Sequence, residues 1–231
     1  MKIPLSNRLR ACCDLIRPDD VVADIGCDHG YLGIHLLTTG GARRVLAGDV
    51  NPQPLESAIA NAEKFGVRDK MRFYLSDGLK NIPRDLTVAV LAGMGADTMI
   101  AILDAAPWIR DGKYRLVLQC QSHRPQLRRY LYEQGFQIRR ETLAQDGKFI
   151  YPVMEVVWGP TTALTSGGYY ISPALIQSRS PLLPAFYQRI LDSIGTTVEG
   201  LRLSGSPKLS EFEALLQELK EMEEQIHGQG M

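Results

Sequence analysis

The sequence predicts an α/β fold, in which a mostly parallel sheet carries helices on both faces and a small helical domain follows. Between residue 21 and about residue 159, short β-rich runs alternate with helical patterns, as they do in parallel sheets covered by helices. Two β runs at the end of this region are separated only by a turn, so one strand must be antiparallel. Beyond residue 160 the apolar residues recur at helical spacing.

Five short apolar runs in the first 120 residues predict the parallel strands, and helical patterns follow four of them. Proline near a helix start and glycine just past its end mark several of the boundaries. The predicted strands are Val21–Ile25, Arg44–Val50, Met71–Leu75, Thr87–Ala92 and Arg115–Gln119. The predicted helices are Tyr31–Thr38, Pro54–Phe65, Asp97–Ala105 and Pro125–Gln134.

A β-hairpin closes the predicted sheet. Its strands, Gln137–Leu143 and Tyr151–Trp158, flank a turn-forming segment at residues 145–148. This ending is typical of methyltransferases that use S-adenosylmethionine (SAM) and unusual in dinucleotide dehydrogenases. Ahead of the sheet, Ser6 is placed to cap a helix whose apolar residues recur at helical spacing. The predicted fold class is therefore the Rossmann-like class I SAM-methyltransferase fold.

The region after Gly159-Pro160 has a different character. Residues 161–168 predict a linker, and two amphipathic helices follow, one starting at Leu183 and one near Pro207. Two such helices joined by a short turn predict an antiparallel, coiled-coil-like hairpin. We therefore expect a methyltransferase domain at residues 1–160 and a helical domain at residues 161–231.

Composition limits the classes of protein to which the chain can belong. Its 231 residues are 45% hydrophobic and 23% charged, which is ordinary for a globular protein. The sequence has no apolar run of about 18 residues and no signal-peptide pattern at its start, so we expect a cytoplasmic protein that does not cross a membrane. The four cysteines form no metal-binding pattern, which predicts free thiols and no metal site. The oligomeric state is left open between a monomer and a weak dimer.

The most informative segment runs from Asp24 to Leu32, with the sequence DIGCDHGYL. It follows the first predicted strand and opens a helix. Glycines in such a turn, here Gly26 and Gly30, let the backbone approach a bound ligand closely. The spacing D-x-G-x-D-x-G differs from the G-x-G-x-x-G of dinucleotide-binding turns, which cradle a pyrophosphate. SAM has no pyrophosphate, so the loop predicts contact with its methionine moiety.

Acidic residues end the next two predicted strands. Asp49 is placed to bind both ribose hydroxyls of an adenosine, and Asp77, followed by Gly78, can accept from the adenine amino group. The alternative interpretation makes Asp28, Asp49 and Asp77 helix N-caps. Because all three occupy corresponding positions along the predicted sheet, the cofactor interpretation is favoured.

The fourth strand ends in a glycine-rich segment that includes Gly93 and Met94. In this fold that strand end faces the transferred methyl group, so the glycines predict room for a flat substrate. The alternative is a tight turn in which Asp97 caps the next helix. His29, beside Asp28, is a candidate catalytic or positioning group, although it could also be an ordinary loop histidine. Several arginines are candidates for phosphate contacts, although ordinary solvated surface is the favoured interpretation for any single one. They are Arg43, Arg44, Arg124, Arg128, Arg129, Arg139 and Arg140, together with a group near the N-terminus formed by Arg8, Arg10 and Arg17.

Taken together, these segments resemble the bacterial tRNA (adenine-N1)-methyltransferase family known as TrmK. The resemblance rests on LSNRL at residues 5–9, VADIGCDHGYL at 22–32, AGDV at 47–50, SDGL at 76–79, AGMG at 92–95, LRRYL at 127–131 and DGKFIYPVMEV at 146–156. Two positions differ from the family's usual pattern: Ala96 replaces a glycine, which would narrow the pocket, and Cys120 replaces a proline.

The resemblance implies a SAM-dependent enzyme that methylates N1 of adenine 22 in tRNA, with tRNA as its partner. It places Gly26, Asp28, His29 and Tyr31 in the SAM loop. It also assigns Asp49 to the ribose, Asp77 and Gly78 to the adenine, and Gly93 and Met94 to the border of the target base. Asp28 is the candidate carboxylate for stabilising the cationic product. Two alternatives remain: a methyltransferase acting on a small molecule or protein, and a non-catalytic binding module with the same fold.

Overall fold

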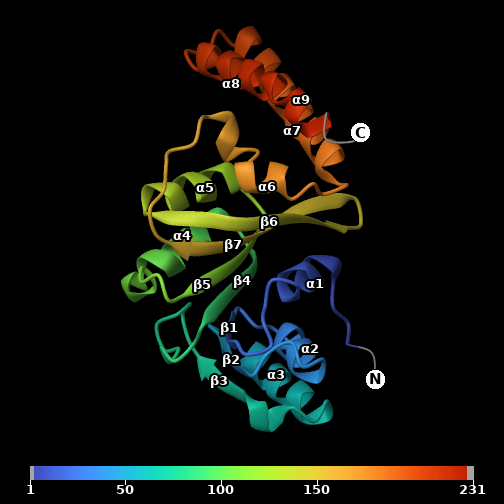
Figure 1. Ribbon diagram of the computed structural model, residues 1–231, viewed down its shortest axis with the longest axis vertical. Helices are drawn as coiled ribbons and strands as arrows, with labels where there is room; N and C mark the ends of the chain where they lie inside the picture. The colour runs from blue at the N-terminus through green and yellow to red at the C-terminus, as the bar shows by residue number, and fades with distance from the viewer. Residues whose placement is uncertain (1–2, 228–231) are drawn as a thin grey trace. The chain divides into compact units, whose positions relative to one another are not determined.

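The computed structural model describes residues 3–227 and contains a seven-stranded sheet (Figure 1). Its strand order is β3-β2-β1-β4-β5-β7-β6, with the first five strands parallel and β7 antiparallel to both of its neighbours. The strands are β1 (Val21–Ile25), β2 (Arg44–Asp49), β3 (Met71–Leu75), β4 (Val88–Met94), β5 (Arg115–Cys120), β6 (Phe136–Asp146) and β7 (Phe149–Trp158). The predicted parallel sheet with a terminal antiparallel hairpin is confirmed.

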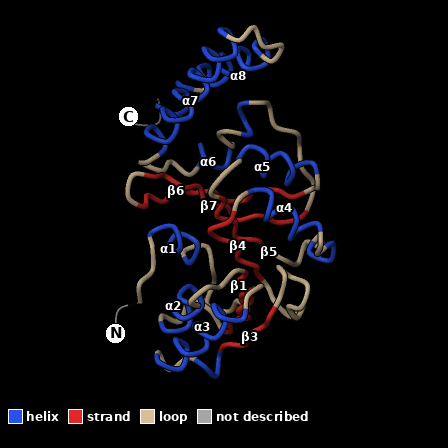
Figure 2. Tube along the Cα trace, turned by 180° about the vertical axis from the view of Figure 1, so that it is seen from behind, coloured by secondary structure: helices blue, strands red, loops and turns tan. Residues whose placement is uncertain are grey.

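Helices cover both faces of this sheet. On one face, α1, α2 and α3 share a buried cluster with β1, β2 and β4, because apolar residues line the inner side of each helix. On the other face, α4 and α5 pack against each other (Figures 1 and 2). The helices are α1 (Asn7–Cys13), α2 (Tyr31–Thr38), α3 (Pro52–Lys64), α4 (Ala96–Asp104) and α5 (Arg124–Glu133), with short 3-10 helices η1 (Arg68–Lys70) and η2 (Pro107–Ile109).

Most predicted boundaries fall within two residues of the observed ones. The hydroxyl of Ser6 accepts from the N–H of Leu9 and so caps α1, as predicted. The hairpin strands were predicted too short, because Gln145 and Asp146 belong to β6 and not to a turn. Both carry contacts to α1: the side-chain amide of Asn7 donates to the carbonyl of Gln145, and the carboxylate of Asp146 accepts from backbone N–H groups of α1.

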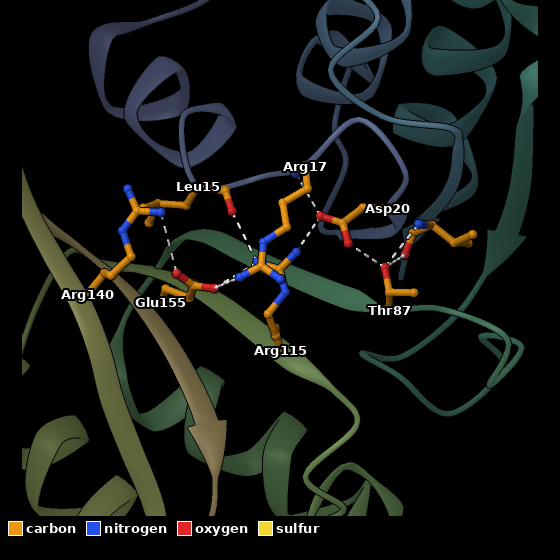
Figure 3. A network of polar contacts seen from close by, with 8 residues as sticks. Leu15, Arg17, Asp20, Thr87, Arg115, Arg140 and Glu155 are labelled. Atoms are coloured by element: carbon orange, nitrogen blue, oxygen red, sulfur yellow. Dashed lines mark hydrogen bonds and ion pairs between the residues drawn. The ribbon is translucent and has the colours of Figure 1, made fainter.

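A network of ion pairs braces the end of the sheet opposite the carboxyl ends of its parallel strands (Figure 3). Arg115, at the start of β5, pairs with Asp20 ahead of β1 and with Glu155 on β7, the latter at 2.8 Å. Asp20 also accepts from the hydroxyl of Thr87 at 2.7 Å. Arg115, Asp20 and Glu155 are largely buried, so the network joins β5, β7 and the segment before β1 with little screening by water.

The chain divides into two compact units between Thr161 and Thr162. The second unit holds a helical hairpin, in which Tyr187 early in α7 donates to the carbonyl of Leu219 late in α8, and Arg202 late in α7 pairs with Glu213 early in α8. These contacts make the two helices antiparallel. The helices of this unit are α6 (Pro173–Gln177), α7 (Leu183–Leu203), α8 (Leu209–Glu221) and α9 (Glu223–His227), preceded by η3 (Gly167–Tyr169).

Two features of this unit were not predicted. The helical pattern that runs to Ile226 in the sequence is interrupted at Met222, so α8 and α9 are separate helices. The short helix α6 was missed, although Ser172 caps it by accepting from the N–H of Leu175 and Pro173 opens it.

Candidate functional site

The loop between β1 and α2 lies at the carboxyl edge of the sheet and has an unusual backbone. Gly26, Asp28 and Gly30 all have positive φ, at 72°, 50° and 71°. The carbonyl of Gly48 on β2 accepts from the N–H groups of Gly26 and Cys27, at 2.8 and 3.0 Å. Gly30, and not Asp28, is the N-cap residue of α2, so the capping alternative for Asp28 is wrong.

Asp49 holds this loop in place from the end of β2. Its carboxylate accepts from the N–H of Asp28 at 3.2 Å and from the N–H of Asn51 at 3.0 Å. Asn51, and not Asp49, is the N-cap residue of α3. The side chain of Asp49 therefore positions the glycine-rich loop directly, a role that the sequence did not indicate.

Asp24 is a buried acid of the site. Its side chain lies beneath the loop at the end of β1, where the N–H of Gly33 donates to it, and its Oδ2 atom has no partner among the described residues. Burial, together with the nearby charge of Asp49, raises the pKa of Asp24 to about 7. A buried carboxylate oxygen without a partner at a cavity wall can accept a hydrogen bond from a molecule that enters the cavity.

Two cavities adjoin along this edge, and Gly26 lines both of them. The first has a volume of about 230 Å³, and its wall includes Arg8, Asp24, Asp28, His29, Tyr31 and Gly93. The second has a volume of about 250 Å³, and its wall includes Asp49, Ser76, Asp77, Gly78, Lys80 and Met94. The structure thus brings the predicted cofactor-binding and catalytic residues to two neighbouring cavities on one edge of the sheet.

Asp77 and Gly78 both line the second cavity, but their neighbours differ. The carboxylate of Asp77 is mostly exposed and pairs with Lys80 at 2.5 Å. Gly78 has a φ of 58°, and a Cβ atom at this position would lie 2.8 Å from the side chain of Ile102 on α4. Only glycine fits there without displacing α4 or straining the backbone.

Gly93 and Met94 lie at an irregularity in the pairing of β4 with β5, and each lines a different cavity. Gly93, with a φ of 79°, lines the first cavity, whereas Met94 lines the second. The methyl carbon of Met94 lies 2.6 Å from the place where a Cβ atom of residue 26 would be, so its side chain covers Gly26 between the two cavities. Ala96 is fully buried at the start of α4 and lines neither cavity.

His29, Asp28 and Tyr31 form the outer rim of the first cavity. His29 Nε2 lies 3.6 Å from the carboxylate of Asp28, and the rings of His29 and Tyr31 are 5.6 Å apart between centroids. The side chains of Asp28 and His29 are largely exposed, at 71% and 51%. They are therefore open to a molecule that approaches this edge.

Arg8 is a residue of the site that sequence reasoning did not place there. It is on α1, 16 residues before Asp24, yet its side chain lines the first cavity. Its Nη1 atom donates to Oε1 of Gln119 at 3.0 Å, and the N–H of Gly93 donates to the same oxygen at 3.0 Å. Its Nε atom lies 3.5 Å from the carboxylate of Asp146. The sequence places Arg8 only in a group of N-terminal basic residues, because its contacts come from β5 and β6.

The candidate phosphate-binding arginines differ in accessibility. Arg128 is buried and pairs with Glu141, so it is neither an accessible phosphate contact nor part of the solvated surface. Burial and the neighbouring Arg128 lower the pKa of Arg124 at the start of α5. Arg44 pairs with Asp85, and Arg140 pairs with Glu155 at 3.7 Å.

Within residues 3–227, no group of three or more His, Cys, Asp or Glu side chains could hold a metal ion. In the same part of the chain, no helix has both the length and the apolar character needed to span a membrane.

Comparison with known proteins places these features in a family. A family model described as a methyltransferase domain matches residues 5–154. The tRNA (adenine(22)-N(1))-methyltransferase of Bacillus subtilis is 29% identical over 185 residues, covering 78% of each chain. The crystal structure of the B. subtilis M1A22 tRNA methyltransferase TrmK superposes with a TM-score of 0.77 at 26% identity, covering 97% of this chain and 98% of that one. Sp1610 of Streptococcus pneumoniae, in complex with S-adenosyl-L-methionine, gives a TM-score of 0.78 at 27% identity, with coverage of 96% and 100%.

Proposed function

Since this chain belongs to the TrmK family of methyltransferases, we propose that it transfers a methyl group from SAM to N1 of adenine 22 in tRNA. The observation that carries the proposal is the pair of adjoining cavities at the carboxyl edge of the sheet, which share Gly26. One has the polar groups that suit an amino acid, and the other has those that suit a nucleoside. SAM is a molecule composed of these two halves.

The nucleoside half fits the second cavity. Asp49 reaches this cavity from the end of β2 and can accept from the ribose hydroxyls. Asp77 is exposed there to accept from an amino group, and Gly78 leaves the wall flat beside it. We assign these three residues to adenosine binding.

The amino-acid half fits the first cavity, which offers one cation and one buried acid. The unpaired Oδ2 atom of Asp24 suits an ammonium group, and the guanidinium of Arg8 suits a carboxylate. Gly26 and Tyr31 supply the floor and rim of the same cavity. SAM bound in this way would supply an electrophilic methyl group on a sulfonium.

The chain's own task is then to position the base and exclude water, because the lone pair of neutral adenine N1 attacks a methyl group without a prior proton transfer. Gly93 borders the first cavity without a side chain, which leaves room for a flat base, and Met94 covers the neighbouring loop. Methylation leaves a positive charge on the base. The exposed carboxylate of Asp28, with His29 beside it, is the candidate group for stabilising that charge.

We assign cofactor binding and catalysis to residues 1–160 and a role in holding tRNA to the helical residues 161–231. Every residue that lines the two cavities belongs to the first segment. N1 lies on the pairing edge of adenine, so the target nucleotide must be unpaired or flipped, which costs a few kcal/mol. A second domain that grips the rest of the tRNA can offset that cost. We place the protein in the cytoplasm, where such a substrate is found.

The proposal is tested by incubating the protein with SAM and an unmodified tRNA transcript that has adenine at position 22. We expect 1-methyladenosine in the nucleoside digest, and none from a matched transcript with guanine at that position. Equal methylation of the two transcripts would refute the assignment to position 22. Methylation of proteins or small molecules with no tRNA product would favour the alternative substrate class.

A further inference from the structure

The β6–β7 hairpin extends beyond the rest of the sheet at the catalytic edge. Pairing of β7 with β5 ends at Leu118 and Met154, but β6 and β7 continue to pair with each other for five more residue pairs, from Thr142–Val153 to Asp146–Phe149. Because β7 is antiparallel to β5, this extension points past the carboxyl ends of the parallel strands. Figures 1 and 2 both show the hairpin tip beside α1.

Contacts with α1 hold one face of this extension next to the first cavity. Val153 and Ala144 pack in the same buried cluster as α1 residues Cys12 and Cys13. Nearer the tip, the carboxylate of Asp146 accepts from the N–H of Asn7 at 2.9 Å and pairs with Arg8, which lines the first cavity. The tip is therefore held to the wall of the cavity that Gly93 also lines.

Two aromatic side chains lie on the same face of the hairpin, nearer its tip. Phe149 and Tyr151 alternate with Ile150 along β7, so they share the face of Val153, and their ring centroids are 6.1 Å apart. Phe149 lies directly opposite Asp146 and is 53% exposed, one of the few large apolar side chains so open to water. The ammonium of Lys148 lies 5.3 Å from the centroid of the Phe149 ring.

We propose that Phe149 and Tyr151 form a shelf on which an unpaired nucleobase of the RNA substrate stacks, with Lys148 placed for the adjoining phosphate. The inference rests on the proposed function and specifies how its substrate is bound. An exposed ring beside a cation suits a nucleotide, because stacking uses the π-face of the base and the cation attracts the backbone. An enzyme that modifies the pairing edge must meet unpaired bases, and this shelf is joined to the cavity through Asp146 and Arg8.

The test separates the contribution of the aromatic π-face of Phe149 from that of its apolar volume. F149L keeps an apolar side chain but has no π-face, whereas F149W keeps both. We expect the affinity of F149L for the tRNA transcript to fall about tenfold and that of F149W to stay near the wild-type value. Affinity for S-adenosylhomocysteine and the melting temperature should change in neither variant. W158L is the matched control, since Trp158 is an exposed aromatic residue at the other end of β7 and should not affect tRNA affinity.

Tryptophan fluorescence gives a second readout of tRNA binding, and it too requires no enzymatic activity. The indole introduced by F149W should be quenched when tRNA binds, beyond any change seen in the wild-type protein, which already contains Trp108 and Trp158. Wild-type tRNA affinity in F149L, or no additional quenching in F149W, would overturn the shelf while leaving the proposed function intact. If the wild-type protein neither binds nor methylates tRNA, the proposed function fails and the shelf fails with it.

Discussion

At the residue scale, the sequence predicted which side chains gather at the site but not how each is held. The spacing of Asp24, Asp49 and Asp77 placed them correctly, because the carboxyl ends of parallel strands share one edge of a sheet. The contact of Asp49 with the N–H of Asp28 could not be predicted, since it depends on the positive φ of the loop. Arg8 was missed because its partners Gln119 and Asp146 are more than 100 residues away in the chain.

Asp24 supports a prediction about pH. A carboxyl group in an unfolded chain ionises near pH 4, whereas burial and Asp49 raise the pKa of folded Asp24 to about 7. Between these values the folded protein binds the extra proton, so this group makes the protein less stable as the pH rises. In D24N the side chain does not titrate. Without cofactor, the free energy of unfolding of the wild type relative to D24N should fall from about pH 4 to pH 7 and then level off.

Urea denaturation of both proteins across this range measures that difference, in which the titrations of the other groups largely cancel. A difference that does not vary with pH would show that Asp24 ionises normally in the folded state.

At the scale of the elements, prediction succeeded where local signals decide and failed where distant contacts do. The bounds of β1 and β3 were predicted correctly because a glycine, Gly26, follows the first apolar run and a polar residue, Ser76, follows the other. The hairpin strands were too short in the prediction because Gln145 and Asp146 suit a turn by composition. Contacts from Asn7 and Arg8 keep them in β6 instead, which is a tertiary effect.

Substitution of Arg115 tests how much its buried ion pairs contribute to the free energy of unfolding. Its side chain is 11% exposed and compensates two buried carboxylates, Asp20 and Glu155. R115M should lower the free energy of unfolding by about 3–5 kcal/mol, because it leaves both charges without their main partner. Arg17 also pairs with Glu155, at 3.4 Å, but is 60% exposed, so R17A should cost less than about 1 kcal/mol. Chemical denaturation compares them, and equal losses would contradict this account of the network.

At the scale of the whole molecule, the division at Thr161 and Thr162 separates the cofactor cavities from the helical hairpin. The division lies close to Gly159-Pro160, where the pattern of apolar residues in the sequence changes. The proposed role of the helical residues in holding tRNA, by contrast, is not encoded in any local pattern. The amphipathic spacing of α7 and α8 reflects their packing against each other, as the Tyr187–Leu219 hydrogen bond shows. Such spacing carries no information about a partner.

A chain truncated after Thr161 should keep its affinity for S-adenosylhomocysteine within about threefold, because all cavity residues are retained. Its affinity for the tRNA transcript should fall at least tenfold, because the helical residues proposed to hold the substrate are removed. The salt dependence of binding should persist, since the candidate phosphate-binding arginines precede residue 161. Calorimetry and filter binding measure the two affinities. Full tRNA affinity in the truncated protein would show that the helical domain does not hold the substrate.

The proposed methylation of N1 of adenine 22 in tRNA can be measured in cells. The most direct measurement is mass analysis of tRNA nucleosides and RNase fragments from cells that lack the protein. We predict that 1-methyladenosine disappears from position 22 and returns when the wild-type chain, but not D24N, is supplied. Unchanged 1-methyladenosine at that position in the deleted cells would contradict the account.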